Sequence, residues 1–253
     1  MSIQSVDRAL SILNLFSASM TQLGITEIAK SINLTNSTTH GLVKTLHHNG
    51  YLYQDPDTKK YSLGIRNVEL GHYFLGASKI YQAGAAASYR LAEDTNLNTR
   101  LAILEKDKIV VILSVYSKSD RFQYYHIGPR IPLYCTALGK TILARFLKDE
   151  FKQYIERTSF HAFTPHTITD PQLLAVSLRN ADSDGYVMDK EEMIRGTVCI
   201  GAPIFDRHNK PIAAISLSSG LDLINHENFQ NLTDNLVRTA ADISYALGHR
   251  NLP

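Results

Sequence analysis

Residues 25–46 carry apolar side chains at the spacing of two short helices with a polar break between them. The apolar positions are Ile25, Ile28, Ala29, Ile32, Leu42, Val43 and Leu46. Thr35 lies in the break, where its hydroxyl can accept a hydrogen bond from the backbone N–H of Ser37 or Thr38 and begin the second helix. This pattern predicts a helix-turn-helix.

A projection of the second helix at about 100° per residue separates a buried stripe from an outer face. The stripe holds Thr39, Leu42, Val43 and Leu46. The outer face carries small, hydrogen-bonding and cationic groups, namely Ser37, His40, Gly41, Lys44 and His48. Such a face suits the major groove of DNA, although the solvated face of an ordinary helical hairpin is the alternative.

Elements on both sides complete a small domain. Ser5 is expected to cap a first helix whose core-facing residues are Val6, Ala9, Leu10, Leu13 and Phe16. Aromatic-rich segments at 51–53 and 60–63 flank a Pro-Asp turn, which predicts a β-hairpin, the wing of a winged helix-turn-helix. Lys59 and Lys60 at its tip can reach a phosphate backbone, or can serve only to keep the tip soluble.

From about residue 96 the pattern becomes mixed α/β, after apolar helices at 65–77 and 80–93. Strands are predicted at 99–104, 108–115, 122–127, 186–189, 198–205 and 212–218. Helices are predicted at 136–147, 148–157 and 171–183, and an amphipathic helix at 229–247 closes the chain. These elements predict an antiparallel sheet with helices on its faces.

The composition is that of an ordinary globular protein. A length of 253 residues with 44% apolar content allows about two domains with a core each. No apolar run approaches the roughly 20 residues that span a bilayer, and the first residues lack a basic region followed by an apolar one, so a cytoplasmic chain is expected. Cys135 and Cys199 are the two cysteines and are expected to be reduced.

Net charge gives weak support to DNA binding. Residues 1–77 hold six Lys and Arg against five Asp and Glu, which leaves +1. Phosphate binding would therefore depend on a few placed cations, hydroxyls and helix N-termini, doubled in a dimer.

Short motifs recur in order along nearly the whole chain. In the N-terminal part these are SVDRAL at 5–10, TEIA at 26–29, STTH at 37–40, GYL at 50–52 and YSLG at 61–64. In the C-terminal part they are IPLYCTALGK at 131–140, TIT at 167–169, GY at 185–186, DKEE at 189–192, GTVCIGAPIFD at 196–206 and ISLS at 215–218. Together these motifs resemble those of IclR-type bacterial transcriptional regulators.

The resemblance implies an α+β architecture with three parts. These are a winged helix-turn-helix DNA-binding domain at 1–64, a linker helix at 65–79 and a GAF-like α/β effector-binding domain at 80–253. It also implies a homodimer or a dimer of dimers on double-stranded operator DNA, with repression the commoner outcome in the family. An effector-independent or activating regulator is the alternative.

The residues predicted to contact DNA are Thr26, Ser37, Thr38, His40, Gly41, Lys44, Lys59 and Lys60. Relatives commonly carry a basic residue where this chain has Asn36 and an arginine where it has Gly41. His40 and Lys44 then remain the main side chains able to reach base edges.

The segment at 135–140 is the candidate start of an effector pocket. Ala137, Leu138 and Gly139 open a predicted helix, whose free N–H groups favour a carboxylate, and the small Ala137 and Gly139 would let a ligand approach the backbone. The alternative is a tightly packed strand-to-helix junction.

The resemblance implies that Asp189, Cys199, Ser216 and Ser218 complete this pocket. Ser216 and Ser218 alternate on one face of a strand and can direct two hydroxyls at one ligand. Asp189 would repel a carboxylate, so we expect it to accept from a ligand hydroxyl, with Cys199 as a small wall residue. The set predicts a small hydroxylated acid, either a sugar acid or a 2-hydroxy or 2-keto acid. Polar aromatic edges could come from Tyr125, His126 and Tyr134, for which core packing is the equal alternative.

An enzyme is not predicted. Walker A, GxSxG, HExxH and glycine-rich dinucleotide motifs are absent from the sequence. Asp189, Glu191 and Glu192, and separately His161 and His166, lack a spacing that dictates metal or acid–base chemistry, and a solvated acidic turn is the preferred interpretation of the carboxylates. No catalytic residue, metal ligand or cofactor is therefore expected.

Overall fold

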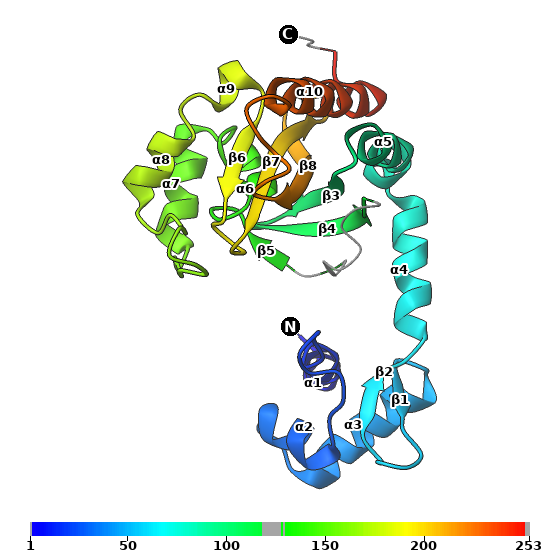
Figure 1. The fold of residues 1–253 in the computed structure, drawn as a ribbon. Coiled ribbons are helices and arrows are strands. Elements are labelled where there is room, and N and C mark those ends of the chain that lie inside the picture. Colours follow the sequence, from blue (N-terminus) through cyan, green and yellow to red (C-terminus); the bar gives the residue numbers. More distant parts are fainter. Residues whose placement is uncertain (1, 118–127, 129, 251–253) are drawn as a thin grey trace. The chain divides into compact units, whose positions relative to one another are not determined.

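The computed structural model describes residues 2–117, 128 and 130–250 (Figure 1). It divides into two compact units, residues 1–77 and 78–253. The strand predicted at 122–127 lies outside the described residues, as do Tyr125 and His126.

The first unit is a winged helix-turn-helix. Its helices are α1 (Gln4–Leu13), α2 (Ile25–Ser31), α3 (Asn36–His48) and α4 (Arg66–Ala77), and its antiparallel hairpin pairs β1 (Leu52–Gln54) with β2 (Tyr61–Leu63). One apolar core joins the three first helices to the hairpin, and its buried members are Ile12, Leu23, Ile28, Val43, Leu46, Leu52 and Tyr61. The hydrophobic period of α2 and α3 therefore packs as the sequence predicts.

Helix α1 differs from its prediction in its cap and in part of its buried face. The helix begins at Gln4 with Ile3 as N-cap and no side-chain cap bond, so the predicted Ser5 cap is wrong. Ala9, Leu13 and Phe16 pack against the core as predicted, and Ile12 is fully buried in it. Val6 and Leu10 are about half exposed, so these two predicted core positions are wrong.

Among its described residues, the second unit is built on a six-stranded antiparallel sheet in the order β5-β4-β3-β8-β7-β6. The strands are β3 (Asn98–Glu105), β4 (Lys108–Val115), β5 (Arg130–Pro132), β6 (Val187–Lys190), β7 (Thr197–Phe205) and β8 (Pro211–Gly220). The helices are α5 (Lys79–Thr95), α6 (Ala137–Leu143), α7 (Lys148–Arg157), α8 (Pro171–Ser177), α9 (Ala181–Asp184) and α10 (Phe229–Ala246).

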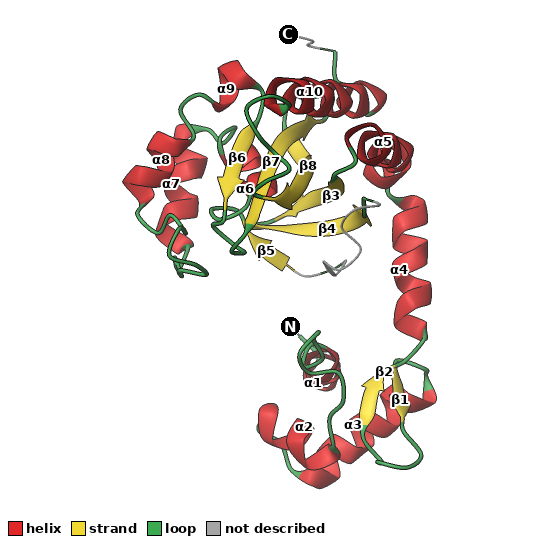
Figure 2. Ribbon diagram, in the orientation of Figure 1, coloured by secondary structure: helices red, strands yellow, loops and turns green. Residues whose placement is uncertain are grey.

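Helices cover both faces of this sheet (Figure 2). Helices α5 and α10 pack on one face, where a Cβ at Gly84 of α5 would lie 2.6 Å from the side chain of Leu101 on β3. Helix α6 packs on the other face, where a Cβ at Gly201 of β7 would lie 2.6 Å from the backbone of Ala137. Side chains alternate between the two faces along each strand, so each strand supplies residues to both layers.

Two predicted helices are shorter or divided in the structure. Helix α6 ends at Leu143 instead of residue 147, and the segment predicted at 171–183 forms the two short helices α8 and α9. The closing helix α10 spans nearly the predicted residues.

Candidate functional site

A cavity of about 260 Å³ lies between α6 and the sheet face that α6 covers. Its walls come from β3, β4, β5, β6, β7 and β8, from the start of α6 and from the loop between β6 and β7. The lining residues are Arg100, Ile109, Val111, Arg130, Ile131, Thr136, Ala137, Leu138, Asp189, Met193, Ile194, Thr197, Cys199 and Ser216. The size suits one small molecule.

Five of the seven predicted effector residues line this cavity, namely Ala137, Leu138, Asp189, Cys199 and Ser216. Strand register explains why distant residues meet there. Asp189 on β6 pairs with Cys199 on β7, which pairs with Ser218 on β8. Ser218 is fully buried beside Cys199 and, like Gly139, is not among the residues that line the cavity.

Gly139 lies in the first turn of α6, where the helix packs against the extended segment that contains Leu133. A Cβ at this position would lie 2.4 Å from the backbone of Leu133, so only glycine fits. Its N–H donates to the Thr136 hydroxyl at 3.1 Å, which caps α6. The prediction that Gly139 admits a ligand to the backbone is therefore corrected: the missing side chain admits Leu133.

Asp189 is 4% exposed and accepts a hydrogen bond from the Glu192 N–H at 2.8 Å. Burial raises the pKa of its carboxyl to about 7, and the nearby Glu192 carboxylate adds to this rise. The Glu192 N–H bond and the Lys140 ammonium act in the opposite direction. A carboxyl that titrates near neutral pH can either donate to or accept from a ligand hydroxyl.

Glu192 is also buried, at 5% exposed, and its carboxylate lies 2.5 Å from the ammonium of Lys140 on α6. This ion pair ties α6 to the loop that follows Asp189. The predicted solvated acidic turn is therefore wrong for Asp189 and Glu192, because the sheet and α6 enclose both. Glu191 is only partly buried and lies 3.8 Å from the His166 ring.

Neither cysteine is a reactive thiolate. Burial and then the Asp189 carboxyl raise the pKa of Cys199 to about 12, which Arg100 partly offsets. Burial likewise raises the pKa of Cys135 to about 12, and its sulfur lies 3.7 Å from that of Met193. Cys199 thus has the wall position that the sequence predicts.

Two hydroxyls on the cavity wall add hydrogen-bonding capacity. The Oγ of Ser216 and the Oγ1 of Thr197 are buried and have no hydrogen-bond partner within the described part of the chain. Buried polar atoms are normally bonded, so both are candidates to meet a ligand. Tyr134 is engaged elsewhere, since its hydroxyl donates to the His161 carbonyl at 2.9 Å and its ring packs on Phe160.

Arg100 is a buried charged residue of the cavity wall that sequence reasoning missed. It is 7% exposed, lies on β3 opposite Ser216 of β8 and contributes to the cavity wall. The available signal was a single charge inside an otherwise apolar strand pattern at 99–104. A buried cation of this kind requires a polar or charged environment.

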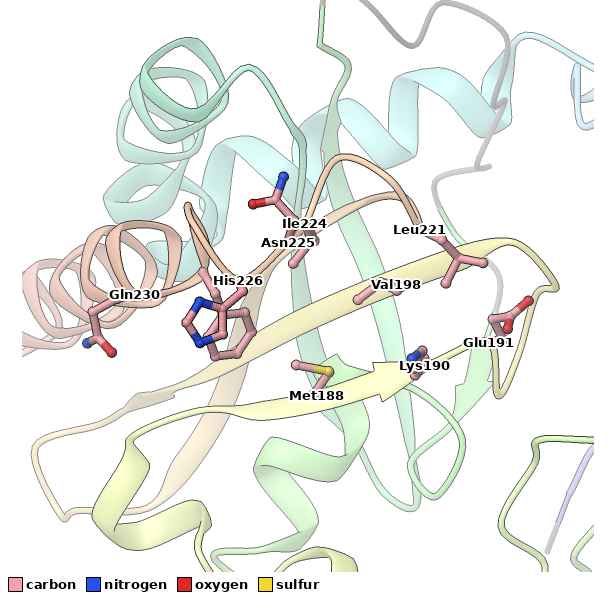
Figure 3. Close-up of a pocket in the computed structure, with 10 residues that line it drawn as sticks. Met188, Lys190, Glu191, Val198, Leu221, Ile224, Asn225, His226 and Gln230 are labelled. Atoms are coloured by element: carbon pink, nitrogen blue, oxygen red, sulfur yellow. The ribbon is translucent and has the colours of Figure 1, made fainter.

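A second hollow of about 730 Å³ lies on the opposite face of the sheet (Figure 3). Met188 and Lys190 line it because they alternate with Asp189 along β6, and the loop before α10 supplies Asn225 and His226. Lys190 and His226 are exposed. None of its described charged residues is buried, so this open groove lacks the enclosed polar groups that bind a small acid.

Helix α3 has the orientation that the sequence predicts. Thr39 and Val43 are fully buried, while Ser37, Thr38, His40, Gly41 and Lys44 are exposed. Thr35 caps the helix by accepting from the Thr38 N–H at 3.3 Å. The outer face is therefore available to a groove of DNA.

The other predicted DNA contacts lie on α2 and the hairpin. Thr26 is exposed in the first turn of α2. Lys59 and Lys60 are exposed, Lys59 with a left-handed φ of 58°, and the Lys60 ammonium lies 3.9 Å from the Glu27 carboxylate. The Asp55 carboxylate orders the tip by accepting from the Thr58 N–H at 2.7 Å and hydroxyl at 2.8 Å, and these bonds lower its pKa.

Within the described ranges, no group of three or more His, Cys, Asp or Glu side chains is arranged to hold a metal ion. No helix of those ranges has the length and apolar content to cross a membrane.

Comparisons with known proteins match both units. Residues 5–56 match the IclR helix-turn-helix domain, and residues 73–245 match the family described as bacterial transcriptional regulator IclR C-terminal. The chain is 35% identical to the HTH-type transcriptional regulator XynR of Escherichia coli K12, over 98% of each protein. It is 32% identical to the regulator KdgR of the same organism, over 92% of this chain and 88% of that protein.

Among solved structures, the Thermotoga maritima IclR is 27% identical and superimposes with a TM-score of 0.79 over 98% of this chain and 100% of that chain. These matches confirm the predicted combination of an N-terminal helix-turn-helix with a C-terminal α/β domain. The matched families and relatives are regulators, not enzymes. The chain therefore belongs to the IclR family of DNA-binding bacterial transcriptional regulators.

Proposed function

We propose that this regulator is a repressor whose operator affinity is set by a small hydroxylated carboxylic acid bound in the cavity beside α6. The observation that carries this proposal is the enclosed wall of buried polar groups, in which Asp189, Ser216 and Thr197 accompany the cation of Arg100. Asp189 and the two hydroxyls would bond ligand hydroxyls, and Ala137 and Leu138 at the start of α6 would form the wall against which the ligand packs. Sugar acids and 2-hydroxy or 2-keto acids have this combination of groups.

At the DNA end, His40 and Lys44 of α3 would read base edges. Ser37 and Thr38 at the start of α3, Thr26 of α2, and Lys59 and Lys60 of the hairpin would contact phosphates. Gly41 would allow a close approach of the backbone to the groove.

A homodimer, or a dimer of dimers, would place two such helices on a palindromic operator. Support comes from exposed apolar residues on α1 and along α4, a helix with no buried residue of its own. They include Ile3, Val6, Leu10, Ile65, Val68, Tyr73 and Phe74, each more than half exposed. Apolar surface at this density commonly marks a protein interface. We also assign the chain to the cytoplasm, because its proposed partner is chromosomal DNA.

The paired DNA-binding domains would have two arrangements, and the acid would bind the protein with a different affinity in each. The linker helix would connect the effector-binding domain to the DNA-binding domain. The operator affinity changes only by the ratio of the acid's affinities for those two arrangements. If the acid-free protein represses transcription by binding the operator, then binding of the acid should release the operator.

The test begins with operator DNA selected from a random-sequence library by the purified protein. Fluorescence anisotropy then gives operator affinity with and without aldonic, 2-hydroxy and 2-keto acids of two to six carbons. We expect at least one acid to weaken binding by about tenfold, within the usual range of coupling between two sites. Affinity that responds to none of these acids would instead favour an effector-independent regulator, and tighter binding would favour an activator.

A further inference from the structure

We infer that Arg100 is the residue that binds the effector's carboxylate, and that it makes the cavity select acids over the neutral alcohols of the same carbon skeleton. This inference rests on the proposed effector-binding function. It assigns the recognition of charge to a strand residue in the middle of the sheet.

The position of Arg100 is fixed by the sheet. On β3 it pairs with Ser114 of β4 on one side and with Ser216 of β8 on the other, and Ser216 pairs in turn with Gly201 of β7. The side chains of Arg100 and Ser216 enter the same cavity. A guanidinium in that row can bond a ligand oxygen that Ser216 also reaches.

Arg100 is the buried cation among the described residues that line the cavity. Lys140 is buried too, but it is not among those lining residues, and its ammonium lies 2.5 Å from the Glu192 carboxylate. Arg130 lines the cavity from the edge strand β5 and is exposed, so water screens its charge. Asp189 is the cavity's own carboxyl, and burial opposes its ionisation.

Arg100 has donors enough for more than one partner. The guanidinium carries five N–H groups in a rigid fork. A carboxylate can accept two parallel bonds from that fork, a geometry that an alcohol lacks. Arg100 would therefore contribute more than Ser216 or Asp189 to the difference in affinity between an acid and the matching alcohol.

The start of α6 is a weaker candidate for this role. The helix has seven residues, and its Gly139 N–H already donates to the Thr136 hydroxyl. A short helix whose first N–H groups are already hydrogen-bonded stabilises a carboxylate less than a buried guanidinium does.

The experiment measures binding of matched acid and alcohol pairs to the full-length protein by isothermal titration calorimetry. The pairs are glycerate with glycerol and gluconate with glucitol. The proteins are wild type, Arg100→Met, Arg100→Lys and the control Arg130→Met. We expect wild type to prefer each acid by about 30-fold and Arg100→Met to lose most of that preference, with alcohol affinity changed by less than about threefold.

The two other variants sharpen the result. Arg100→Lys keeps the charge without the fork, so an intermediate acid affinity is expected, and this variant remains informative if Arg100→Met does not fold. Arg130→Met is expected to weaken acid binding by about threefold or less, with the difference disappearing in high salt.

The outcomes separate the two proposals. A wild-type protein that prefers acids, with the full preference kept in Arg100→Met and Arg100→Lys, would overturn the role of Arg100 and leave the proposed effector class standing. Equal loss of acid and alcohol binding would mean a structural role for Arg100 and would also overturn the inference. A wild-type protein that prefers alcohols, or binds neither member of any pair, would overturn the effector class and the inference together.

Discussion

The two recognition surfaces of this chain place their polar residues differently with respect to the core. On α3 the groups expected to meet DNA are exposed, and the buried side of the helix holds Thr39, Val43 and Leu46. In the second unit the groups expected to meet a ligand, Asp189 and Arg100, are themselves nine-tenths or more buried. DNA contacts can therefore be changed at little cost to stability, whereas a change in the ligand site also changes the stability of the fold.

The largest effect is expected where the cavity wall is held by a buried ion pair. Lys140→Met leaves the Glu192 carboxylate buried without its 2.5 Å partner, and we expect a loss of about 3 kcal/mol in the free energy of unfolding of the second unit. Urea unfolding of the full chain, followed by near-UV circular dichroism, measures it. The double variant Lys140→Met/Glu192→Leu should recover most of the loss because no unpaired charge remains.

Lys152→Met, which removes a well-exposed partner of Glu156, is the matched control and should leave stability unchanged. If Lys140→Met proved as harmless as Lys152→Met, the buried pair would contribute nothing to the cavity wall.

A smaller effect, with a defined pH dependence, is expected at Asp189. Because its folded pKa of about 7 lies above the unfolded value, the unfolded chain loses this proton first as pH rises. The stability contributed by Asp189 is therefore complete below about pH 4, declines up to about pH 7 and is constant above it.

Asp189→Asn removes this titration while its amide oxygen can still accept the Glu192 N–H. Relative to wild type we expect it to gain about 2 kcal/mol at pH 8 and almost nothing near pH 4, measured by urea unfolding across that range. A stability difference that does not change with pH would exclude Asp189 as the titrating group.

On the DNA side the expected effects are on binding and not on folding. Lys44→Ala should weaken operator binding by about tenfold and lower its salt dependence, because an exposed cation on the outer face of α3 is lost. Thr39→Val should bind like wild type, since Thr39 is fully buried and its hydroxyl has no hydrogen-bond partner in the described part of the chain. Equal losses of affinity in two folded variants, measured by anisotropy, would contradict the orientation of α3.

The smallest effect is expected at Gly41. A Cβ there would meet no atom within 4 Å, so Gly41→Ala should stabilise α3 by about 0.5–1 kcal/mol through helix propensity alone. Thermal unfolding measures this gain, and anisotropy on the same variant tests close approach to DNA, which predicts a several-fold loss of affinity. Unchanged affinity would mean that the glycine is tolerated at this position without a role in binding.

Sequence patterns predicted the helices α2 and α3 well because one face of each is buried and the other is exposed. The strands β3, β4, β7 and β8 are covered on both faces, and they were predicted from apolar runs bounded by turn residues. Helix α1 is apolar on more than one side, so its pattern predicted Ala9 and Leu13 correctly as core-facing but also included Val6 and Leu10, which are about half exposed.

The site was predicted only as far as motifs extended. Asp189, Cys199 and Ser216 were predicted from the resemblance to a family, whereas Arg100 lies outside the motifs that carry this resemblance and reaches the cavity wall through strand pairing with β8. The burial of Glu192 could not be predicted either, because its partner Lys140 is 52 residues away in the chain. Long-range pairing of this kind leaves no local pattern.

The claim that ties both surfaces together is the coupling between acid and operator, and one thermodynamic cycle measures it directly. Operator affinity is determined with and without saturating acid, and acid affinity with and without saturating operator, on the same full-length protein. The two ratios are expected to be equal, as linkage requires, and near tenfold. Ratios of one, with acid bound in the cavity, would contradict this claim.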